Sequence, residues 1–237
     1  SRSERARARR PPKARALLVN SPNNPSGVIY PASVFVESEA MLARASHPIV
    51  LVSDEPYRAL VFDDVAVPEV SPLVTRSIVA TSWSKSLAIP GERIGYLAFS
   101  PRMPEAAELF EACTFTSRVL GFVNAPALWQ WVVAEVGDQV IDVSPYREKR
   151  DLMYEGLTRI GYQCVKPQGA FYVFPRTPID DDVAFVRVLA EEGVLTVPGS
   201  GFGMPGHIRI SLTVERETVV RALPGFERAF RKARGGG

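Results

Sequence analysis

The chain has 237 residues, of which 46% are hydrophobic and 23% are charged. This composition is typical of a globular protein and argues against a disordered or collagen-like chain. The length suits one large domain or two smaller ones. No apolar run reaches membrane-spanning length and no segment has the form of a signal peptide, so we expect a protein of the cytoplasm with no membrane partner.

The net charge of +2 hides a basic start. Residues 1–15 hold seven basic residues against one acid, Glu4. Basic arms of this kind can bind nucleic acid, but this one lacks the interleaved aromatic residues on which bases stack. We therefore expect no nucleic-acid partner.

Cysteine and histidine are scarce. Cys113 and Cys164 lie far apart and suggest neither a disulfide framework nor a metal site, and only His47 and His207 could serve a histidine-based triad. We predict no metal centre and two reduced thiols.

In the first part of the chain, short apolar runs rich in β-branched residues alternate with helical patterns. The apolar runs are continuous, as in strands of a parallel or mixed sheet that is covered on both faces. They lie at 16–20, 48–54, 76–82 and 93–100. Helices are predicted at 32–46, 104–115, 124–136 and 146–160.

The pattern changes towards the C-terminus. Strands are predicted at 170–175, 194–199 and 207–212, with helices at 181–193 and 215–232, the last interrupted at Pro224. We therefore expect an α/β protein. A large-domain sheet sandwiched by helices, residues 1–142, would be followed by a smaller α+β domain, residues 143–237.

Polar groups follow the first three predicted strands. SPNNPSG follows the first, Asp54 and Tyr57 follow the second, and Ser84 and Lys85 follow the third. Taken singly, these are a turn signal, a helix cap and polar loop residues. Ligands of open α/β sheets bind at the carboxyl ends of the strands, so together the groups predict a cofactor site at one edge of the sheet.

With these motifs the chain resembles the class I and II aminotransferases, the fold type I pyridoxal-phosphate enzymes that include aspartate aminotransferase. The matching motifs run in family order and are NNPSG (23–27), SDEPY (53–57), SWSKSLAIPGERIGY (82–96), PQGAFYVF (167–174), PGSGFG (198–203) and HIRISL (207–212). The resemblance implies that the chain is N-terminally truncated, because it begins shortly before the NPxG motif. It would then be an incomplete enzyme by itself.

The resemblance also implies roles for single residues. Lys85 would form a Schiff base with pyridoxal 5′-phosphate and then move the α-proton of the substrate. Asp54 would keep the pyridine nitrogen protonated. Tyr57 and Asn24 would hydrogen-bond the 3-oxygen of the ring.

Anions would be held by two further groups. Ser82 and Arg93, helped by Ser84, would bind the cofactor phosphate. Arg209, with Asn24, would bind the substrate α-carboxylate, whereas a simpler interpretation makes Arg209 a surface arginine in an ion pair. The implied reaction moves an amino group from an amino acid to a 2-oxo acid, in a full-length protein that is a homodimer.

Two other functions compete with this one, and a third is rejected. The same residues would serve a carbon–sulfur lyase or related eliminase on this fold. The chain could also be the aminotransferase-like effector domain of a transcription regulator, although it shows no helix-turn-helix pattern. GFGMPG (201–206) matches GxGxxG but leads into a predicted strand, which argues against a nicotinamide dehydrogenase.

Overall fold

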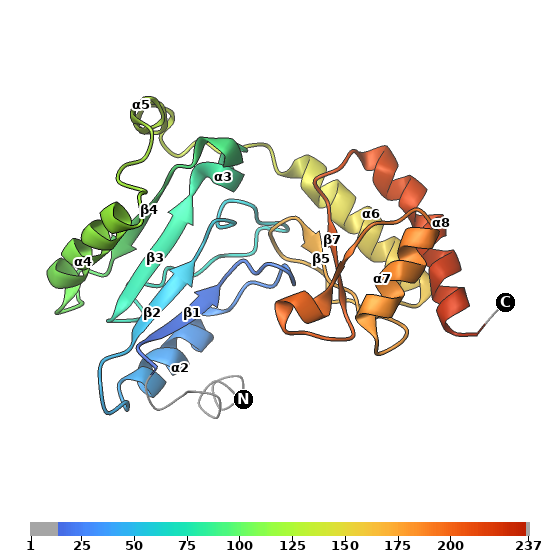
Figure 1. Ribbon diagram of the computed structural model, residues 1–237, viewed down its shortest axis with the longest axis horizontal. Coiled ribbons are helices and arrows are strands. Elements are labelled where there is room, and N and C mark those ends of the chain that lie inside the picture. The colour runs from blue at the N-terminus through green and yellow to red at the C-terminus, as the bar shows by residue number, and fades with distance from the viewer. Residues whose placement is uncertain (1–13, 236–237) are drawn as a thin grey trace. The chain divides into compact units, whose positions relative to one another are not determined.

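The structure is a computed structural model that describes residues 14–235 (Figure 1). The basic arm predicted from residues 1–15 therefore lies almost entirely outside the described residues. The chain divides into two compact units, which we describe separately. Unit 1 comprises the described residues up to Pro22 together with Ile29–Ala59 and Ala66–Ile141, and unit 2 comprises Asn23–Val28, Leu60–Val65 and the residues from Asp142 onward. The functional division into domains at residues 142 and 143 stays a prediction.

Unit 1 is built on a four-stranded mixed sheet. Its strands, in spatial order, are β1 (Ala16–Asn20), β2 (Val50–Asp54), β3 (Ser77–Ser82) and β4 (Gly95–Phe99). The first three strands are parallel and β4 is antiparallel to β3. In this register Asn20 lies opposite Asp54, so the polar ends of β1 and β2 are neighbours at one edge of the sheet.

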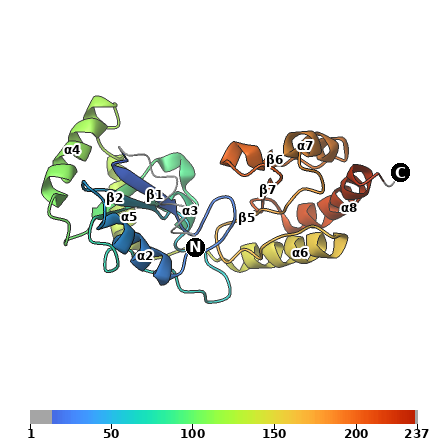
Figure 2. The same ribbon diagram turned by 90° about the horizontal axis from the view of Figure 1, so that it is seen from below.

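One face of this sheet is covered by α2 (Ala32–Leu42), as Figures 1 and 2 show. Phe35, Met41 and Leu42 on α2 share a buried core with Leu51 of β2. The other helical elements of unit 1 are α3 (Trp83–Ser86), the 3₁₀ turn η1 (Pro90–Glu92), α4 (Ala106–Val119) and α5 (Ala127–Val136). The four strands and the helices α2, α4 and α5 lie where the sequence predicts them, whereas α3 and η1 were not predicted.

The prediction that both faces of the sheet are covered was wrong for the outer strands. Leu18 on β1 is 70% exposed and Leu97 on β4 is 47% exposed. Helices α4 and α5 have no buried residue among those described, and Trp131 on α5 is 78% exposed. Within the described residues, too few other residues pack against these apolar side chains to bury them. The apolar pattern therefore predicted the strands correctly, but not which of their faces are buried.

Unit 2 combines three helices with a small antiparallel sheet. The strands, in spatial order, are β5 (Tyr172–Val173), β7 (Ile208–Ser211) and β6 (Val197–Pro198). The helices are α6 (Ser144–Ile160), α7 (Asp182–Glu191) and α8 (Arg216–Ala233), and the 3₁₀ turn η2 (Gly199–Phe202) follows β6. Strands β5 and β6 are shorter than predicted: β5 covers only Tyr172–Val173 of 170–175, and β6 covers only Val197–Pro198 of 194–199.

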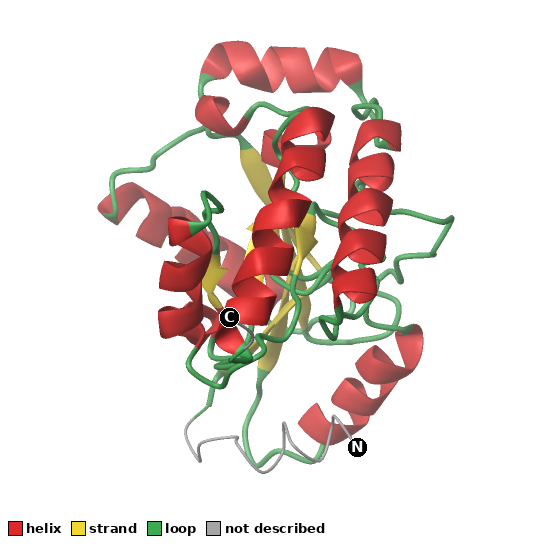
Figure 3. Ribbon diagram, turned by 90° about the vertical axis from the view of Figure 1, so that its right-hand side faces the viewer, coloured by secondary structure: helices red, strands yellow, loops and turns green. Residues whose placement is uncertain are grey.

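Apolar side chains from the three helices form the core of unit 2. Leu157, Phe185, Leu189 and Phe226 are fully buried, and Tyr162 donates its hydroxyl to the carbonyl of Phe226 at 3.0 Å. Burial raises the pKa of the Tyr162 hydroxyl above its ordinary value, so it remains a donor. Figure 3 shows the helices in red and the strands in yellow.

The predicted interruption of the last helix was wrong. Helix α8 continues through Pro224 from Arg216 to Ala233. Pro224 is exposed, whereas Phe226 and Phe230 beyond it are buried with Val219 before it. Packing of one apolar face on both sides of the proline outweighs the hydrogen bond that the proline removes.

No helix in residues 14–235 is both long and apolar enough to cross a bilayer.

Candidate functional site

In unit 1, the predicted cofactor residues lie at the carboxyl ends of neighbouring parallel strands. Asp54 is the last residue of β2 and Ser82 is the last residue of β3. Lys85 lies one turn further, in α3. Because β2 and β3 are parallel and paired in register, these groups occur at the same edge of the sheet.

Asp54 has a partner that the sequence analysis missed. Asn20, at the end of β1, donates its side-chain amide to Asp54 Oδ2 at 3.0 Å and to the Asp54 carbonyl at 2.9 Å. Burial raises the pKa of the Asp54 carboxyl, and the hydrogen bond from Asn20 offsets only part of that rise. A carboxylate that has lost part of its water interacts strongly with a cationic group placed beside it.

The turn after Asp54 is fixed to β3. Glu55 is 3% exposed, accepts from Ser53 Oγ at 2.8 Å and pairs with Arg58 at 3.0 Å. Its backbone N–H donates to Ala80, and its carbonyl accepts from Thr81 Oγ1 at 3.1 Å. These contacts of Glu55 hold in place the segment that carries the buried Tyr57. In the sequence Glu55 looks like an ordinary acid in DEPY, so its supporting role gave no signal.

Helix α3 presents Lys85 and two serines on a single turn. Ser82 precedes the helix, but its side chain makes no capping hydrogen bond, and Ser82, Ser84 and Lys85 are all half-buried. The turn is held by Ile141, whose N–H donates to the Ser86 carbonyl at 2.8 Å. A cavity of about 260 Å³ lies beside it, with Thr81, Ser82 and Ser86 among its lining residues.

Arg93 does not join this group by hydrogen bonding. It is exposed, and its Nη1 donates to the carbonyl of Pro90 at 2.9 Å. Its φ of 53° lies in the left-handed region, which is unusual for an arginine. Among the described residues no hydrogen bond connects it to Ser82 or Ser84, so only its position after η1 agrees with the prediction.

Unit 2 brings Asn24 and Arg209 together. Arg209 Nη1 donates to Asn24 Oδ1 at 3.1 Å. The guanidinium lies over the rings of Tyr172 and Phe202, with its carbon 4.6 Å from each ring centroid. Arg209 Nε is buried and has no hydrogen-bond partner within residues 14–235.

This environment limits what Arg209 can bind. Aromatic rings lie against the guanidinium, so an acceptor is best placed along its plane, where a carboxylate can form two parallel hydrogen bonds. The described ion pairs of the chain do not include Arg209. The arrangement therefore differs from that of a surface arginine in an ion pair.

The loop that carries Phe202 is anchored by Asp182, another residue that the sequence analysis missed. Asp182 is 4% exposed and accepts from the Ser200 N–H at 2.7 Å. Burial by itself would raise the pKa of this carboxyl, but hydrogen bonds from Ser200 and Gly206 outweigh it and lower the pKa. At Gly199 a Cβ would lie 2.3 Å from the Met204 carbonyl, so the loop is also tightly packed.

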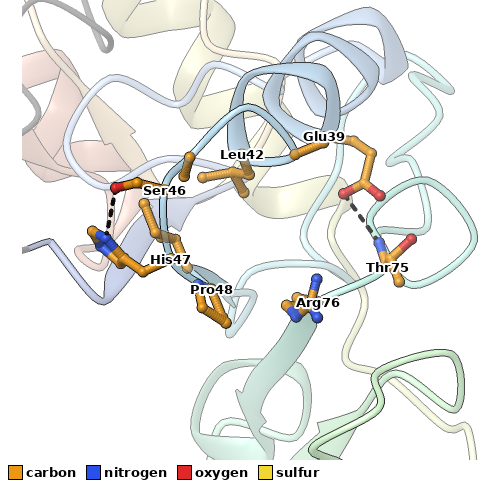
Figure 4. A pocket seen from close by; sticks show the side chains of 10 residues that line it. Glu39, Leu42, Ser46, His47, Pro48, Thr75 and Arg76 are labelled. Atoms are coloured by element: carbon orange, nitrogen blue, oxygen red, sulfur yellow. Dashed lines mark hydrogen bonds between the residues drawn. The ribbon is translucent and has the colours of Figure 1, made fainter.

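A further cavity of unit 1 lies away from these residues, between the end of α2 and the start of β3 (Figure 4). It measures about 490 Å³. Its polar groups are already engaged. Glu39 accepts from the Thr75 N–H at 3.2 Å, and His47 contacts the Ala14 carbonyl at 2.7 Å and Ser46 at 3.3 Å. We assign no chemistry to it. The described residues contain no group of three side chains suited to a metal ion.

The model of the family described as aminotransferase class I and II matches residues 3–225. The chain belongs to this family. It is 35% identical to an aspartate/prephenate aminotransferase of Thermus thermophilus over 97% of this chain and 60% of the relative. It is 31% identical to an aromatic-amino-acid aminotransferase of Thermococcus litoralis over 93% of this chain and 58% of the relative.

A solved structure agrees with this assignment. The crystal structure of an amino transferase from Eubacterium rectale matches with a TM-score of 0.94 at 41% identity, over 97% of this chain and 59% of that one. The predicted family and fold class are thus confirmed, and the family is one of pyridoxal-phosphate-dependent enzymes. The chain spans about 60% of the length of the relatives that it matches.

The residues of this class I and II aminotransferase chain fit that cofactor. A partly desolvated carboxylate at Asp54 suits a protonated ring nitrogen, and the Lys85 amine suits an aldehyde. Ser82, whose hydroxyl does not cap α3, can donate to a phosphate. The present contact of Arg93 is the one feature of the unit 1 set that does not match.

Proposed function

We propose that the protein carrying this chain is a pyridoxal 5′-phosphate-dependent aminotransferase, which moves an amino group from an amino acid to a 2-oxo acid. The observation that carries the proposal is the partly buried Asp54, one strand away from Lys85 at the same edge of the sheet. Membership of the aminotransferase class I and II family supports it. Because the chain spans about 60% of its relatives, the activity is proposed for the full-length protein.

When bound, the cofactor supplies an electron sink for the pair left when the substrate loses its α-proton. Asp54 would hold the proton on the ring nitrogen, and Asn20 keeps the carboxylate oriented for this. Lys85 would bind the cofactor covalently and then carry the proton to and from the substrate α-carbon. Tyr57 and Asn24 would donate hydrogen bonds to the ring 3-oxygen.

The anionic groups would be bound by hydroxyls and arginines. Ser82 and Ser84 would donate to the phosphate, and Arg93 would exchange the Pro90 carbonyl for it. Arg209 would bind the α-carboxylate, with Asn24 beside it. Since amino acids and 2-oxo acids both carry this carboxylate, one arginine serves both half-reactions.

Other functions on the same fold have less support. The relatives described above are named as aminotransferases, and no observation favours a carbon–sulfur lyase or a regulator domain. The relatives' names cover aspartate, prephenate and aromatic amino acids, so a panel of amino acids and 2-oxo acids on the full-length protein would assign the side-chain preference.

We also propose that the full-length protein is a homodimer of the cytoplasm. Exposed apolar side chains on α4 and α5, such as Phe115 and Trp131, support an interface. Cys113 and Cys164 are both free thiols, which agrees with a reducing compartment.

The role of Lys85 provides the test. Borohydride treatment of the full-length protein loaded with cofactor should attach the cofactor irreversibly to the peptide that contains Lys85. Lys85→Ala should abolish turnover while part of the cofactor still binds, because anchoring and proton transfer are separate tasks. The matched control is Lys149→Ala, which removes a lysine that donates to the Val214 carbonyl in unit 2. Labelling of a different lysine would refute the proposal.

A further inference from the structure

Arg150 on α6 is a charged side chain with no exposed surface. Its Nη1 donates to the Pro167 carbonyl at 2.5 Å, and its Nη2 donates to both carboxylate oxygens of Asp63 at 2.9 and 2.8 Å. Nε lies 2.8 Å from Asp151 Oδ1 as an ion pair, without hydrogen-bond alignment. The guanidinium also lies 4.8 Å from the centroid of the Phe62 ring. One side chain therefore connects α6 with two other segments of unit 2.

Stability alone does not account for this arginine. Burying the Arg150 guanidinium removes its charge from water, although its partners Asp63 and Asp151 stay partly exposed, and replacing a buried charge with an apolar residue is often neutral or stabilising. Asp63 has a φ of 59°, in the left-handed region that is strained for an aspartate. A buried charge and a strained partner are more readily explained if Arg150 fixes something that an apolar side chain could not hold. Its bond to the Pro167 carbonyl is such a contact.

Pro167 lies directly against Gly27. A Cβ on Gly27 would be 2.5 Å from the Pro167 Cβ, so only glycine allows this approach, and the φ of Gly27 is +67°. The residues after Pro167 continue the contact. The N–H groups of Gln168 and Gly169 donate to the Gly27 carbonyl at 2.8 and 3.0 Å. The position of the 167–169 segment therefore fixes the position of Gly27.

Gly27 closes the turn that contains Asn24. The Gly27 N–H donates to the Asn23 carbonyl at 2.8 Å, and the Asn23 side chain accepts from the Ser26 N–H at 3.0 Å. Asn24, inside this turn, accepts from Arg209 Nη1 at 3.1 Å. A continuous series of contacts thus runs from Arg150 to the pair Asn24–Arg209, entirely within unit 2.

We propose that Arg150 is a positioning residue for the pair Asn24–Arg209. It holds the 167–169 segment, which holds the turn at Gly27 and sets the direction from which Asn24 meets the guanidinium. The consequence for carboxylate binding rests on the proposed function of Arg209. The mechanical part, from Arg150 to the turn, does not.

The main variant is Arg150→Lys, which keeps the charge but cannot reach Pro167 and Asp63 together. In the full-length protein loaded with cofactor, the dissociation constant of maleate, a dicarboxylate probe, should rise about tenfold or more, and KM for amino acids should rise in parallel. The change in kcat should stay below about threefold, and covalent attachment to Lys85 should be intact. Hydrogen exchange at the Gln168 and Gly169 amides should accelerate.

Lys166→Met is the matched control. Lys166 Nζ lies 3.1 Å from Asp151 and 4.0 Å from Asp63, the same two carboxylates, but the hydrogen bond to the Pro167 carbonyl comes from Arg150. Maleate binding and amide exchange should stay within about twofold of the parent protein. If Arg150→Lys fails to fold, Asp63→Asn weakens the hold on the same guanidinium from its exposed side, because that carboxylate is 47% exposed, and amide exchange and maleate binding should change in the same direction.

Each outcome is decisive. Unchanged amide exchange in a folded Arg150→Lys protein would overturn the mechanical link. Faster exchange with unchanged maleate binding and KM would overturn the link to Arg209, as would equal effects of Lys166→Met. Failure of the proposed function appears separately, because Arg209→Lys would then leave maleate binding unchanged.

Discussion

Replacing Arg209 with lysine separates geometry from charge at the proposed carboxylate site. Lysine keeps the positive charge, but it has no planar fork that can pair with a carboxylate along one plane. It would also lose the stacking between Tyr172 and Phe202 and the bond to Asn24 Oδ1. The substitution therefore changes the direction of the donors more than the electrostatic field.

The size of the effect follows from the interactions that only the guanidinium can make. A hydrogen bond to a charged group contributes about 1.5 to 3 kcal/mol, and a cation–π contact contributes about 0.5 to 2 kcal/mol. Lysine can recover part of both. We expect a net loss of about 2 to 4 kcal/mol in kcat/KM for amino acids, which is about 30- to 700-fold.

The assay compares two substrate classes with the full-length protein. Amino acids should show this loss, whereas primary amines without a carboxylate should react at a rate that changes little. The control is Arg216→Lys, because Arg216 pairs with Glu148 on the surface of unit 2, is 49% exposed and should have little influence. Equal losses for amino acids and for amines would refute the carboxylate role of Arg209.

Three further outcomes are expected. Asp54→Asn should lower turnover about a hundredfold or more. It should nevertheless stabilise the fold at neutral pH, because the raised pKa of Asp54 makes the parent protein lose stability as pH rises from the unfolded-state pKa through the folded-state pKa. Urea unfolding midpoints measured against pH should show this dependence in the parent and its loss in the variant. Asp182→Asn should destabilise the fold at neutral pH. The lowered pKa of Asp182 gives the parent protein stability that is present above the unfolded-state pKa and disappears as pH falls through the folded-state pKa. An equal destabilisation at all pH values would contradict the bond to Ser200. Pro224→Ala should restore a helical hydrogen bond, which should add about 1 kcal/mol to the free energy of unfolding and raise the melting temperature. An unchanged melting temperature would show that α8 tolerates the proline without strain.

The sequence predicted the regular elements well because their signals are local. Continuous apolar runs gave β1, β2, β3 and β4, and helical periodicity gave α2, α6 and α7. The errors fall where tertiary packing decides. Helix α8 passes through Pro224 because its apolar face is packed on both sides, and β5 is shorter than its apolar run.

The assignment of two early segments to unit 2 could not be predicted. Residues 23–28 and 60–65 belong to unit 2, although their neighbours in sequence belong to unit 1. They are held by backbone hydrogen bonds, such as those from Phe62 to Gln168 and from Ala170 to Leu60. Such bonds can be made by almost any residue, so they leave no pattern in the side chains.

Residues that support the site were also missed, for a different reason. Asn20, Glu55, Asp182 and Arg150 each act by holding another group, and each has an ordinary interpretation in the sequence. Arg150 lies in REKR, which is typical of a solvated helix face. Motifs identify groups that would touch cofactor or substrate, whereas supporting residues are defined by partners far away in the chain.

Arg209 shows how far strand alternation can be taken. In a strand, neighbouring side chains point to opposite faces, so Arg209 should point away from Ile208 and Ile210. The two isoleucines are indeed buried, but Arg209 lies among aromatic rings rather than in water, because Tyr172 comes from β5 and Phe202 comes from η2.

This difference strengthens the functional argument. Water around a guanidinium competes for its donors, whereas the contacts with the two rings fix the position of the guanidinium in advance. A planar carboxylate then binds a group that is already oriented, and the buried Nε without a partner among the described residues is the donor that such a ligand would satisfy.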